Sequence, residues 1–546
     1  MEQKSNNKAV YGPGWQALLS LTLVSVSFIL ASPRWHLAVF AWIGPVAALY
    51  FFRVCRLKRK WLWFIPFMTA TILVSMYGVI PFPPPVLLTF ALLGTVRWAL
   101  IFLLDKWVTS RIRSFLGTLF FPCVYIAAEF LMSRTGGGVW WSAGNSQFAF
   151  TWLIQIVSIT GIWGIGFLIY WFASVVVWSL VRFREERPWK RGLTAYATVL
   201  LAVLAYGAFR FHFPVHKAGK VVLIAGVTSP QIPFLEGVYS DYYRKSITID
   251  PRSSVTDPVL QDVRNAEGPF IEKADTLRFR KAREAMRAIT DSLFSLSQQA
   301  AAKGAKIITW SEANCLALPR DEPAITARGI SFASANRVYL LMALGVIHSG
   351  PVTPGTKFLE NKAILLGPDG TVLNVFHKNN PVPFAEASEA GNGIIPVIVT
   401  PYGRLSTSIC YDADFPDQMR QLGKNKSDIL LLPSGDWYAI SPYHSYMALF
   451  RGIENGCSVV RQVSGGLSLA ADYRGRIYAS QDYYNPGPKA WIAEVPVEHV
   501  FTLYSVIGDG FAFGCIGAAA LILLLVAAGG RGMEGNPQNR HSPTEG

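Results

Sequence analysis

A lone cysteine lies where a strand-like segment ends, in the stretch RLSTSICYDADFP at residues 404–416. A sharp turn from a strand into a helix exposes a nucleophile and presents the next backbone N–H to a developing oxyanion. That context makes Cys410 a candidate catalytic thiol. The alternative is a buried apolar cysteine, which is the commonest state of an unpaired one.

Two other apolar runs end in charged residues. Glu312 follows KIITW, and Lys378 follows VFH, with Glu386 eight residues further on across a Pro-rich turn. Each charge alone is more readily explained as a solvated surface group. If these strand ends meet at one edge, however, the acid accepts the thiol proton, the thiolate attacks a carbonyl and the ammonium stabilises the oxyanion. Together, the residues predict acyl transfer.

The elements that must position these residues lie between 211 and 510, a length sufficient for one domain with its own core. An apolar stripe at spacings of three and four predicts a helix over 279–300, and a second helix is predicted over 442–456. The polar segment 236–275 is predicted to be a long excursion that could serve as a mobile flap. Strands are predicted at 221–227, 306–310, 337–346, 361–367, 404–410, 428–435 and 457–463. Apolar strands that alternate with amphipathic helices favour an α/β layered domain.

The chain as a whole has the composition of a membrane protein, since 51% of all residues are hydrophobic and only 16% are charged. We read the first apolar run, which follows Lys4 and Lys8, as a retained span because no small-x-small cleavage site follows it. Eight runs could cross a bilayer, at 15–31, 37–55, 61–80, 86–104, 115–132, 152–181, 193–209 and 511–529. We therefore predict seven spans in residues 1–210, a domain at 211–510, and a last span with a tail at 511–546.

Loop charges predict the orientation. Lys and Arg are concentrated after the second, fourth and sixth runs, so these loops are expected in the cytoplasm and the 211–510 domain outside it. The net charge of +15 lies largely in such membrane-flanking loops, so it implies no nucleic-acid partner. Three cysteines of the outer domain, Cys315, Cys410 and Cys457, cannot all pair with one another, which leaves at least one free thiol.

The motifs WSE, HK followed by PFAE, and ICYD resemble, in their order and separations, the Glu-Lys-Cys triad of the nitrilase, or carbon-nitrogen hydrolase, superfamily. The spans on both sides, with VWWSAGNSQF and TWLIQIVSITGIWGIGFL, are similar to one branch of it, the apolipoprotein N-acyltransferases. The resemblance covers nearly the whole chain. It departs from the usual pattern at Asp412, Ala385, Phe234 and SGDWYAISP, which leaves the reaction type standing and puts the substrate in question.

The resemblance implies a nitrilase-type α-β-β-α sandwich that faces the periplasm from a bacterial inner membrane. An acyl chain would pass from a phospholipid to Cys410 as a thioester, and then to the α-amine of the diacylglyceryl-cysteine that begins a lipoprotein. Glu312 would be the general base and acid, and Lys378 with the N–H of Tyr411 would hold the oxyanion. Glu386 would orient Lys378 or Glu312, while Tyr411 and Asp412 would shape the turn behind the thiol.

Other readings of the sequence stay open. A membrane-anchored amidase, or an N-acyltransferase with a different acceptor, would carry almost the same residues. A papain-like enzyme could use His444 or His348, although it leaves Lys378 and Glu312 unexplained. A transporter is a third reading, because the ionisable Arg97 and Glu129 lie within apparent spans. No His or Cys cluster has metal-ligand spacing and no Gly-rich phosphate loop occurs, so neither a metal nor a cofactor is expected.

Overall fold

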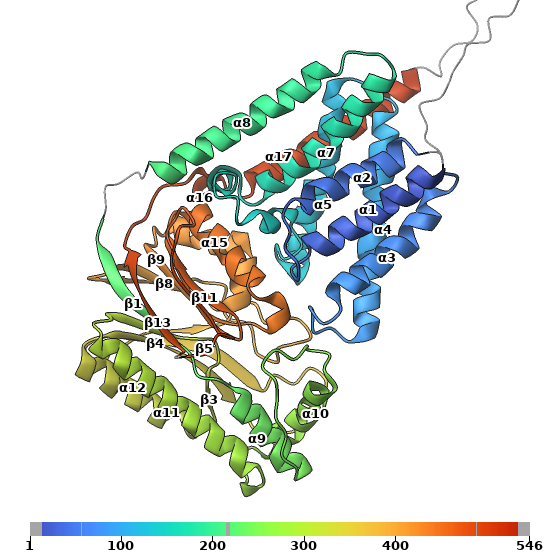
Figure 1. Ribbon diagram of the computed structural model, residues 1–546. Helices are drawn as coiled ribbons and strands as arrows, with labels where there is room; N and C mark the ends of the chain where they lie inside the picture. The colour runs from blue at the N-terminus through green and yellow to red at the C-terminus, as the bar shows by residue number, and fades with distance from the viewer. Residues whose placement is uncertain (1–13, 56, 214–218, 488, 533–546) are drawn as a thin grey trace, which may run out of the picture.

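The computed structural model describes residues 14–55, 57–213, 219–487 and 489–532. A bundle of apolar helices occupies one end of the molecule and an α/β domain the other (Figure 1). Lys4, Lys8 and most of the predicted C-terminal tail lie outside the described residues. The main bundle helices are α1 Gly14–Ala31, α2 Phe40–Arg53, α3 Lys60–Met76, α4 Pro84–Thr109, α5 Phe120–Met132, α7 Trp163–Arg184, α8 Lys190–His212 and α17 Gly510–Gly532.

Five helical segments are long and apolar enough to cross a membrane: Pro84–Thr109, Phe115–Gly137, Trp163–Arg184, Lys190–His212 and Gly510–Ala528. Helices α1, α2 and α3 are apolar but shorter. The protein is therefore a multi-pass membrane protein.

The span predicted over 152–181 is wrong in its first part. Residues 151–162 form turns and the short helices η4 Ile154–Ile156 and α6 Val157–Thr160, and the long helix begins only at Trp163. Gly161 causes the break, since its φ of 64° lies in the left-handed region that glycine tolerates. A Cβ at this position would lie 2.6 Å from the Tyr504 ring, so glycine also permits a close approach.

Two sheets form the α/β domain. The first has the order β13-β1-β2-β4-β5-β6, with β3 paired to β4, and the second has the order β12-β11-β10-β9-β8-β7. The first sheet's strands are β1 Val221–Val227, β2 Ile307–Trp310, β3 Cys315–Ala317, β4 Tyr339–Ile347, β5 Leu359–Leu366, β6 Val372–His377 and β13 Ala490–Pro496. Those of the second are β7 Val397–Thr400, β8 Gly403–Thr407, β9 Ile429–Gly435, β10 Ser458–Ser464, β11 Leu467–Ala471 and β12 Ile477–Asp482.

The two sheets share one apolar core, to which Ile224 and Leu341 contribute from the first sheet and Leu405 and Val460 from the second. Helices α11 Arg280–Ala302 and α12 Glu322–Asn336 cover the outer face of the first sheet. Helix α15 Tyr443–Asn455 packs against the other face of the second sheet and lies toward the helix bundle (Figure 1). The predicted α/β class is confirmed.

The segment 236–275 is not the irregular excursion that its polarity suggested. It contains most of α9 Ile232–Tyr243 and all of α10 Pro258–Lys273. Val238 and Phe270 bury their side chains in the core beneath α11, and the side chain of Asp257 caps α10 by accepting a hydrogen bond from Val259 N. The polar residues lie largely on the outer faces of these helices. Their number made the segment look like a loop in the sequence, although its few apolar residues have helical spacing.

Parallel pairing aligns the strand ends that matter. Strands β1, β2 and β4 run parallel, as do β8, β9 and β10, so within each set the carboxyl ends meet at one edge. Strand β6 runs in the direction of β4, because each is antiparallel to β5. Residues that follow β2 and β6 therefore emerge at the same edge of the first sheet.

Candidate active site

Lys378 is the centre of a buried ion-pair cluster. Its Nζ donates to Glu312 Oε1 at 2.7 Å and to Glu386 Oε2 at 2.5 Å, and all three side chains are at least nine-tenths buried. Burial disfavours the ammonium, but the two carboxylates outweigh it and raise the pKa of Lys378 well above its usual value. Burial likewise opposes the charge on Glu386, yet Lys378 lowers the pKa of that carboxyl. Lys378 is therefore a fixed cation.

Asn361 completes this cluster, although the sequence analysis did not predict it as a site residue. Its Nδ2 donates to Glu312 Oε1 and to Glu386 Oε1, both at 2.8 Å. Ser388 Oγ and Val382 N also donate to Glu386. The asparagine lies near the start of β5, where a polar residue is unremarkable, so only the folded structure shows that it bridges the two carboxylates.

Cys410 follows β8 after a two-residue extension and begins the 3₁₀ turn η6 Cys410–Asp414. The predicted strand over 404–410 is thus too long, because Cys410 has a φ of 47°, which no strand residue adopts. A left-handed conformation at a residue with a side chain costs free energy and occurs mainly at functional sites. Sγ donates to the carbonyl oxygen of Gly435 at 3.5 Å, and burial followed by the charge of Glu312 raises the pKa of the thiol well above 9.

Gly435 brings the acid and the thiol to one place. Its carbonyl oxygen accepts the Cys410 Sγ–H bond, while a Cβ built on it would lie 3.3 Å from Glu312 Oε2. Any larger residue would therefore press on the Glu312 carboxylate. Since Glu312 N also donates to the carbonyl oxygen of Ser434, the end of β9 positions the residue that follows β2.

These residues line a single cavity of about 450 Å³, the Cys410 cavity. Glu312, Lys378, Glu386, Cys410 and Tyr411 all contribute to its wall. The opposite wall comes from the helix bundle and its loops: Ile80, Pro81, Phe82, Val86, Phe90, Trp140 and Trp141. The cavity therefore joins the polar cluster of the α/β domain to apolar side chains around α4, a segment long enough to cross a membrane.

Comparison with known proteins agrees with this arrangement. Residues 284–499 match the model of the carbon-nitrogen hydrolase family, and residues 24–175 match the apolipoprotein N-acyltransferase N-terminal domain. An apolipoprotein N-acyltransferase of Geobacter metallireducens is 26% identical over 74% of this chain and 73% of its own. One from Chlorobaculum tepidum is 23% identical over 94% of this chain and 96% of its own.

The chain belongs to the apolipoprotein N-acyltransferase family. It is an acyltransferase of the carbon-nitrogen hydrolase superfamily, with a nitrilase-type α/β fold joined to several apolar helices. Both matched regions contribute to the Cys410 cavity, since Trp140 and Trp141 come from the first and the cysteine from the second.

Asp412 of this acyltransferase lies outside the cavity wall, beneath the turn. Its carboxylate accepts hydrogen bonds from Ile409 N, Ser408 Oγ, Asn379 N, Asn380 N and Asn380 Nδ2, at 2.7–3.4 Å. These bonds tie the turn that carries Cys410 to the loop that carries Lys378. Burial raises the pKa of Asp412 to about 6, although Lys378 and these donors oppose the shift.

Tyr411 links the same turn to the helix bundle. Its hydroxyl donates to the carbonyl oxygen of Gly136 at 2.9 Å, in the irregular η2 Ser133–Gly137 that follows α5. Val139 N donates to the carbonyl oxygen of Asp414 at 2.8 Å, which adds a second tie. The turn that carries Cys410 is thus fastened directly to the loop that walls the cavity.

A second charged cluster adjoins the thiol. Asp436 accepts two hydrogen bonds from Arg461 and one contact from His444 Nδ1 at 2.8 Å, and His444 Nε2 lies 3.2 Å from Asp414 Oδ1. One ligand atom each of Cys410, Asp436 and His444 lies within 4.8 Å of the others. The sequence analysis did not group these residues, because a turn, a loop and a helix contribute one each. The Arg461 guanidinium already occupies Asp436, so the set is poorly suited to a cation.

The charge state of His444 in this cluster tests the hypothesis of a papain-like enzyme. Burial opposes the charge on His444, but Asp414 and Asp436 raise its pKa to about 9, so the imidazole is protonated at neutral pH and cannot accept the thiol proton. His348 is exposed, lies 3.7 Å from Glu360 and lines a different pocket. Glu312 lines the Cys410 cavity and stays the predicted base.

The transporter hypothesis rested on two ionisable residues within apparent spans, Arg97 and Glu129. Glu129 accepts hydrogen bonds from Tyr170 OH and Ser142 Oγ, at 3.0 and 3.3 Å. In the described part of the chain, no ion pair within 4 Å joins Glu129 to Arg97. Glu129 therefore anchors the 142–146 loop to α5 and α7.

Proposed function

We propose that the protein moves an acyl chain from a phospholipid, through a thioester on Cys410, to the α-amine of the diacylglyceryl-cysteine that begins a lipoprotein. One observation carries this proposal: the wall of the Cys410 cavity combines Glu312, Lys378 and the thiol with apolar side chains of the helix bundle. A substrate that enters from the bilayer could place its ester at the sulfur while its chain stays in apolar surroundings.

In the first half-reaction, Glu312 accepts the Cys410 proton as Sγ bonds to the ester carbonyl carbon. The thiol needs this help because its raised pKa keeps it protonated at neutral pH. The oxyanion forms beside Lys378 and the N–H of Tyr411, which do not have to reorganise to stabilise it. The ester C–O bond then breaks, Glu312 returns the proton to the departing oxygen, and a lysophospholipid leaves.

In the second half-reaction, the acceptor amine attacks the thioester carbonyl. Glu312 takes a proton from the amine, the oxyanion again forms beside Lys378, and the C–S bond breaks. The departing sulfur regains a proton from Glu312, so the enzyme returns to its starting state. Glu386 and Asn361 keep Lys378 and Glu312 in place throughout, through the bonds described above.

The thioester conserves the activation of the acyl group between two lipids that use the same cavity in turn, which implies ping-pong kinetics. The apolar walls of the Cys410 cavity limit the access of water, which favours transfer of the acyl group over its hydrolysis. A membrane-anchored amidase, or an N-acyltransferase with another acceptor, would use the same residues and differ only in what discharges the thioester.

The proposal extends to topology. We place all eight apolar helices α1–α5, α7, α8 and α17 in the bacterial inner membrane, with residues 1–210 as a seven-span domain and residues 211–510 as the periplasmic catalytic domain. The α/β domain would be an α-β-β-α sandwich, as its shared inter-sheet core and outer helices support. The Lys and Arg residues of the loops after α2, α4 and α7 would then face the cytoplasm.

The experiment is a discharge assay. Full-length protein in detergent is incubated with phosphatidylethanolamine, freed of excess lipid and mixed with a diacylated lipopeptide that has a free α-amine. We expect the lipopeptide to gain one acyl mass and lysophospholipid to be released in the first step. Free fatty acid without acylated lipopeptide would support the amidase reading. Cys410→Ala should form neither product. Cys457→Ala is its matched control, because Cys457 is also buried but lies outside the cavity.

A further inference from the structure

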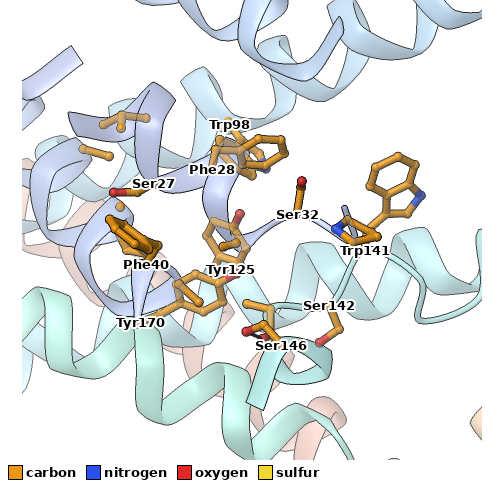
Figure 2. Close-up of a pocket in the computed structure, with 18 of the residues that line it drawn as sticks. Ser27, Phe28, Ser32, Phe40, Trp98, Tyr125, Trp141, Ser142, Ser146 and Tyr170 are labelled. Atoms are coloured by element: carbon orange, nitrogen blue, oxygen red, sulfur yellow. Dashed lines mark hydrogen bonds between the residues drawn. The ribbon is translucent and has the colours of Figure 1, made fainter. Parts of the chain in front are cut away.

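A second cavity lies within the helix bundle, next to the Cys410 cavity. It has a volume of about 120 Å³, and we call it the helix cavity. In Figure 2, Phe28 and Trp98 lie at its upper side, Tyr125 and Tyr170 below them, and Ser142 and Ser146 at its lower edge. The walls come from helices α1–α5, α7 and α15 and from the 140–146 loop, so the cavity is largely aromatic and aliphatic.

Two polar side chains in this wall have no hydrogen-bond partner among the described residues. The Oγ atoms of Ser27 and Ser32 make no hydrogen bond within the part of the chain that the structure describes, although the two residues are only 1% and 6% exposed. Other hydroxyls of the same wall are satisfied, since Ser142 donates to Glu129 and Ser146 to the carbonyl oxygen of Ala143. Buried polar atoms are nearly always paired, so two unpaired hydroxyls beside one cavity point to an occupant with hydrogen-bond acceptors.

Trp140 and Trp141 line both cavities and form the wall between them. The Nε1 of Trp140 is a third buried donor for which residues 14–55, 57–213, 219–487 and 489–532 supply no partner. The Trp140 ring lies 5.5 Å from the ring of His444, and His444 in turn has a ring nitrogen within 4.8 Å of Cys410 Sγ. The two cavities thus adjoin at these indoles, and the imidazole of His444 links Trp140 to the surroundings of Cys410.

Size and chemistry together restrict the ligand. An apolar cavity of about 150 Å³ holds one benzene ring, so 120 Å³ holds roughly five carbons. That is a segment of a chain rather than a whole lipid. Aromatic walls with a few N–H and O–H donors suit an acyl ester, whose carbonyl oxygen accepts hydrogen bonds and whose chain is apolar.

Building on the proposed function, we propose that the helix cavity is a second lipid subsite, which holds the ester-bearing segment of the donor's non-transferred acyl chain while the donor's other ester lies at Cys410. The transferred chain fits this subsite less well, because its carbonyl lies at the sulfur and the rest of it offers no acceptor to Ser27 and Ser32. The two tryptophans would separate the two chains of one phospholipid.

The test compares two donors of the same palmitoyl group. Dipalmitoyl phosphatidylethanolamine has a second chain, whereas p-nitrophenyl palmitate has none; in both cases the thioester forms as the ester C–O bond breaks, releasing lysophospholipid or p-nitrophenolate. Ser27→Leu fills the helix cavity without touching the Cys410 cavity. We expect it to slow acylation of Cys410 by the phospholipid by about tenfold or more and to leave acylation by the single-chain ester within twofold.

Thr22→Leu is the control, because Thr22 lies on the exposed face of α1, and it should leave both rates unchanged. If Ser27→Leu does not fold, Ser27→Val adds less bulk and is measured in the same way. Equal slowing of both donors, or of neither, overturns the subsite. If the unaltered protein accepts an acyl group from neither donor, the proposed function itself fails, so the two failures are distinguishable.

Discussion

Replacing Lys378 with methionine tests how the buried cluster works. The substitution keeps an unbranched side chain, one atom shorter, but removes the ammonium that lies 2.7 Å from Glu312 and 2.5 Å from Glu386. Loss of one partner from a buried ion pair costs about 3–5 kcal/mol of folding free energy. Loss of one oxyanion donor lowers the rate of chemistry by about 10²–10³. Lys378→Met should therefore lose stability and activity together.

The pH dependence of that loss has a defined sign. With Lys378 present, the pKa of Glu386 is lowered, so this carboxylate stabilises the fold above its unfolded pKa and loses that contribution as pH falls through the lower folded pKa. Without the ammonium, burial dominates, so the pKa of Glu386 rises and this carboxylate destabilises the fold as it ionises. The melting temperature of Lys378→Met should therefore fall, relative to that of the unaltered protein, between about pH 5 and pH 8.

The assay is thermal unfolding in detergent at several pH values, together with single-turnover acylation of Cys410. Lys362→Met is the matched control, because Lys362 is also a buried lysine paired with two carboxylates, Glu322 and Glu360, but lies outside the Cys410 cavity. It should lose stability and keep its acylation rate per folded molecule. The reasoning is refuted if both variants acylate Cys410 at the same rate per folded molecule.

Four further predictions follow from single contacts. Gly435→Ala should slow acylation about tenfold or more with little change in melting temperature, because its Cβ would press on Glu312 Oε2, whereas Gly350→Ala, with open space around it, should change neither. Asp412→Asn should lower the unfolding free energy by about 1–3 kcal/mol in denaturant titrations, since an amide nitrogen cannot accept from the donors of the 379–380 loop. The pKa of His444 is raised from 6.5 to about 9, so the unaltered protein should lose stability, on the order of 3 kcal/mol, as pH rises from about 6.5 through 9 and the favourable charge is lost. His444→Gln should abolish this loss. An unchanged dependence of the melting temperature on pH in the variant would contradict the prediction. Tyr411→Phe should cost about 1 kcal/mol and leave acylation within several-fold, since it removes only the bond to Gly136; a complete loss of acylation would mean that the hydroxyl does more than fasten the turn.

The abrupt ends of apolar runs made part of the site predictable from sequence. KIITW and VFH are followed at once by polar residues, and parallel pairing then brings Glu312 and Lys378 to one edge. Asn361 could not be found in this way, because one asparagine near the start of a strand carries no signal until its pairing partners are known. The cluster of Asp436, His444 and Arg461 was hidden for the same reason, since a loop, a helix and a strand contribute one residue each.

The errors in the fold also have physical causes. Hydropathy joined 152–162 to the span that follows, because it cannot register the left-handed Gly161 that breaks the helix before Trp163. Low hydropathy likewise concealed α9 and α10, whose few apolar residues, such as Val238 and Phe270, are spaced for one buried face. The short strands β3 and β7, of three and four residues, gave no period long enough to detect.

The most direct test of the central claim is the position of the acyl group after incubation with phospholipid alone. Full-length protein is mixed with phosphatidylethanolamine vesicles, digested at mildly acidic pH to preserve thioesters, and analysed by peptide mass spectrometry. The account predicts one added acyl mass on the peptide that contains Cys410, sensitive to hydroxylamine and absent from Glu312→Gln. An unmodified Cys410 peptide alongside released lysophospholipid, or an acyl group on another residue, would contradict it.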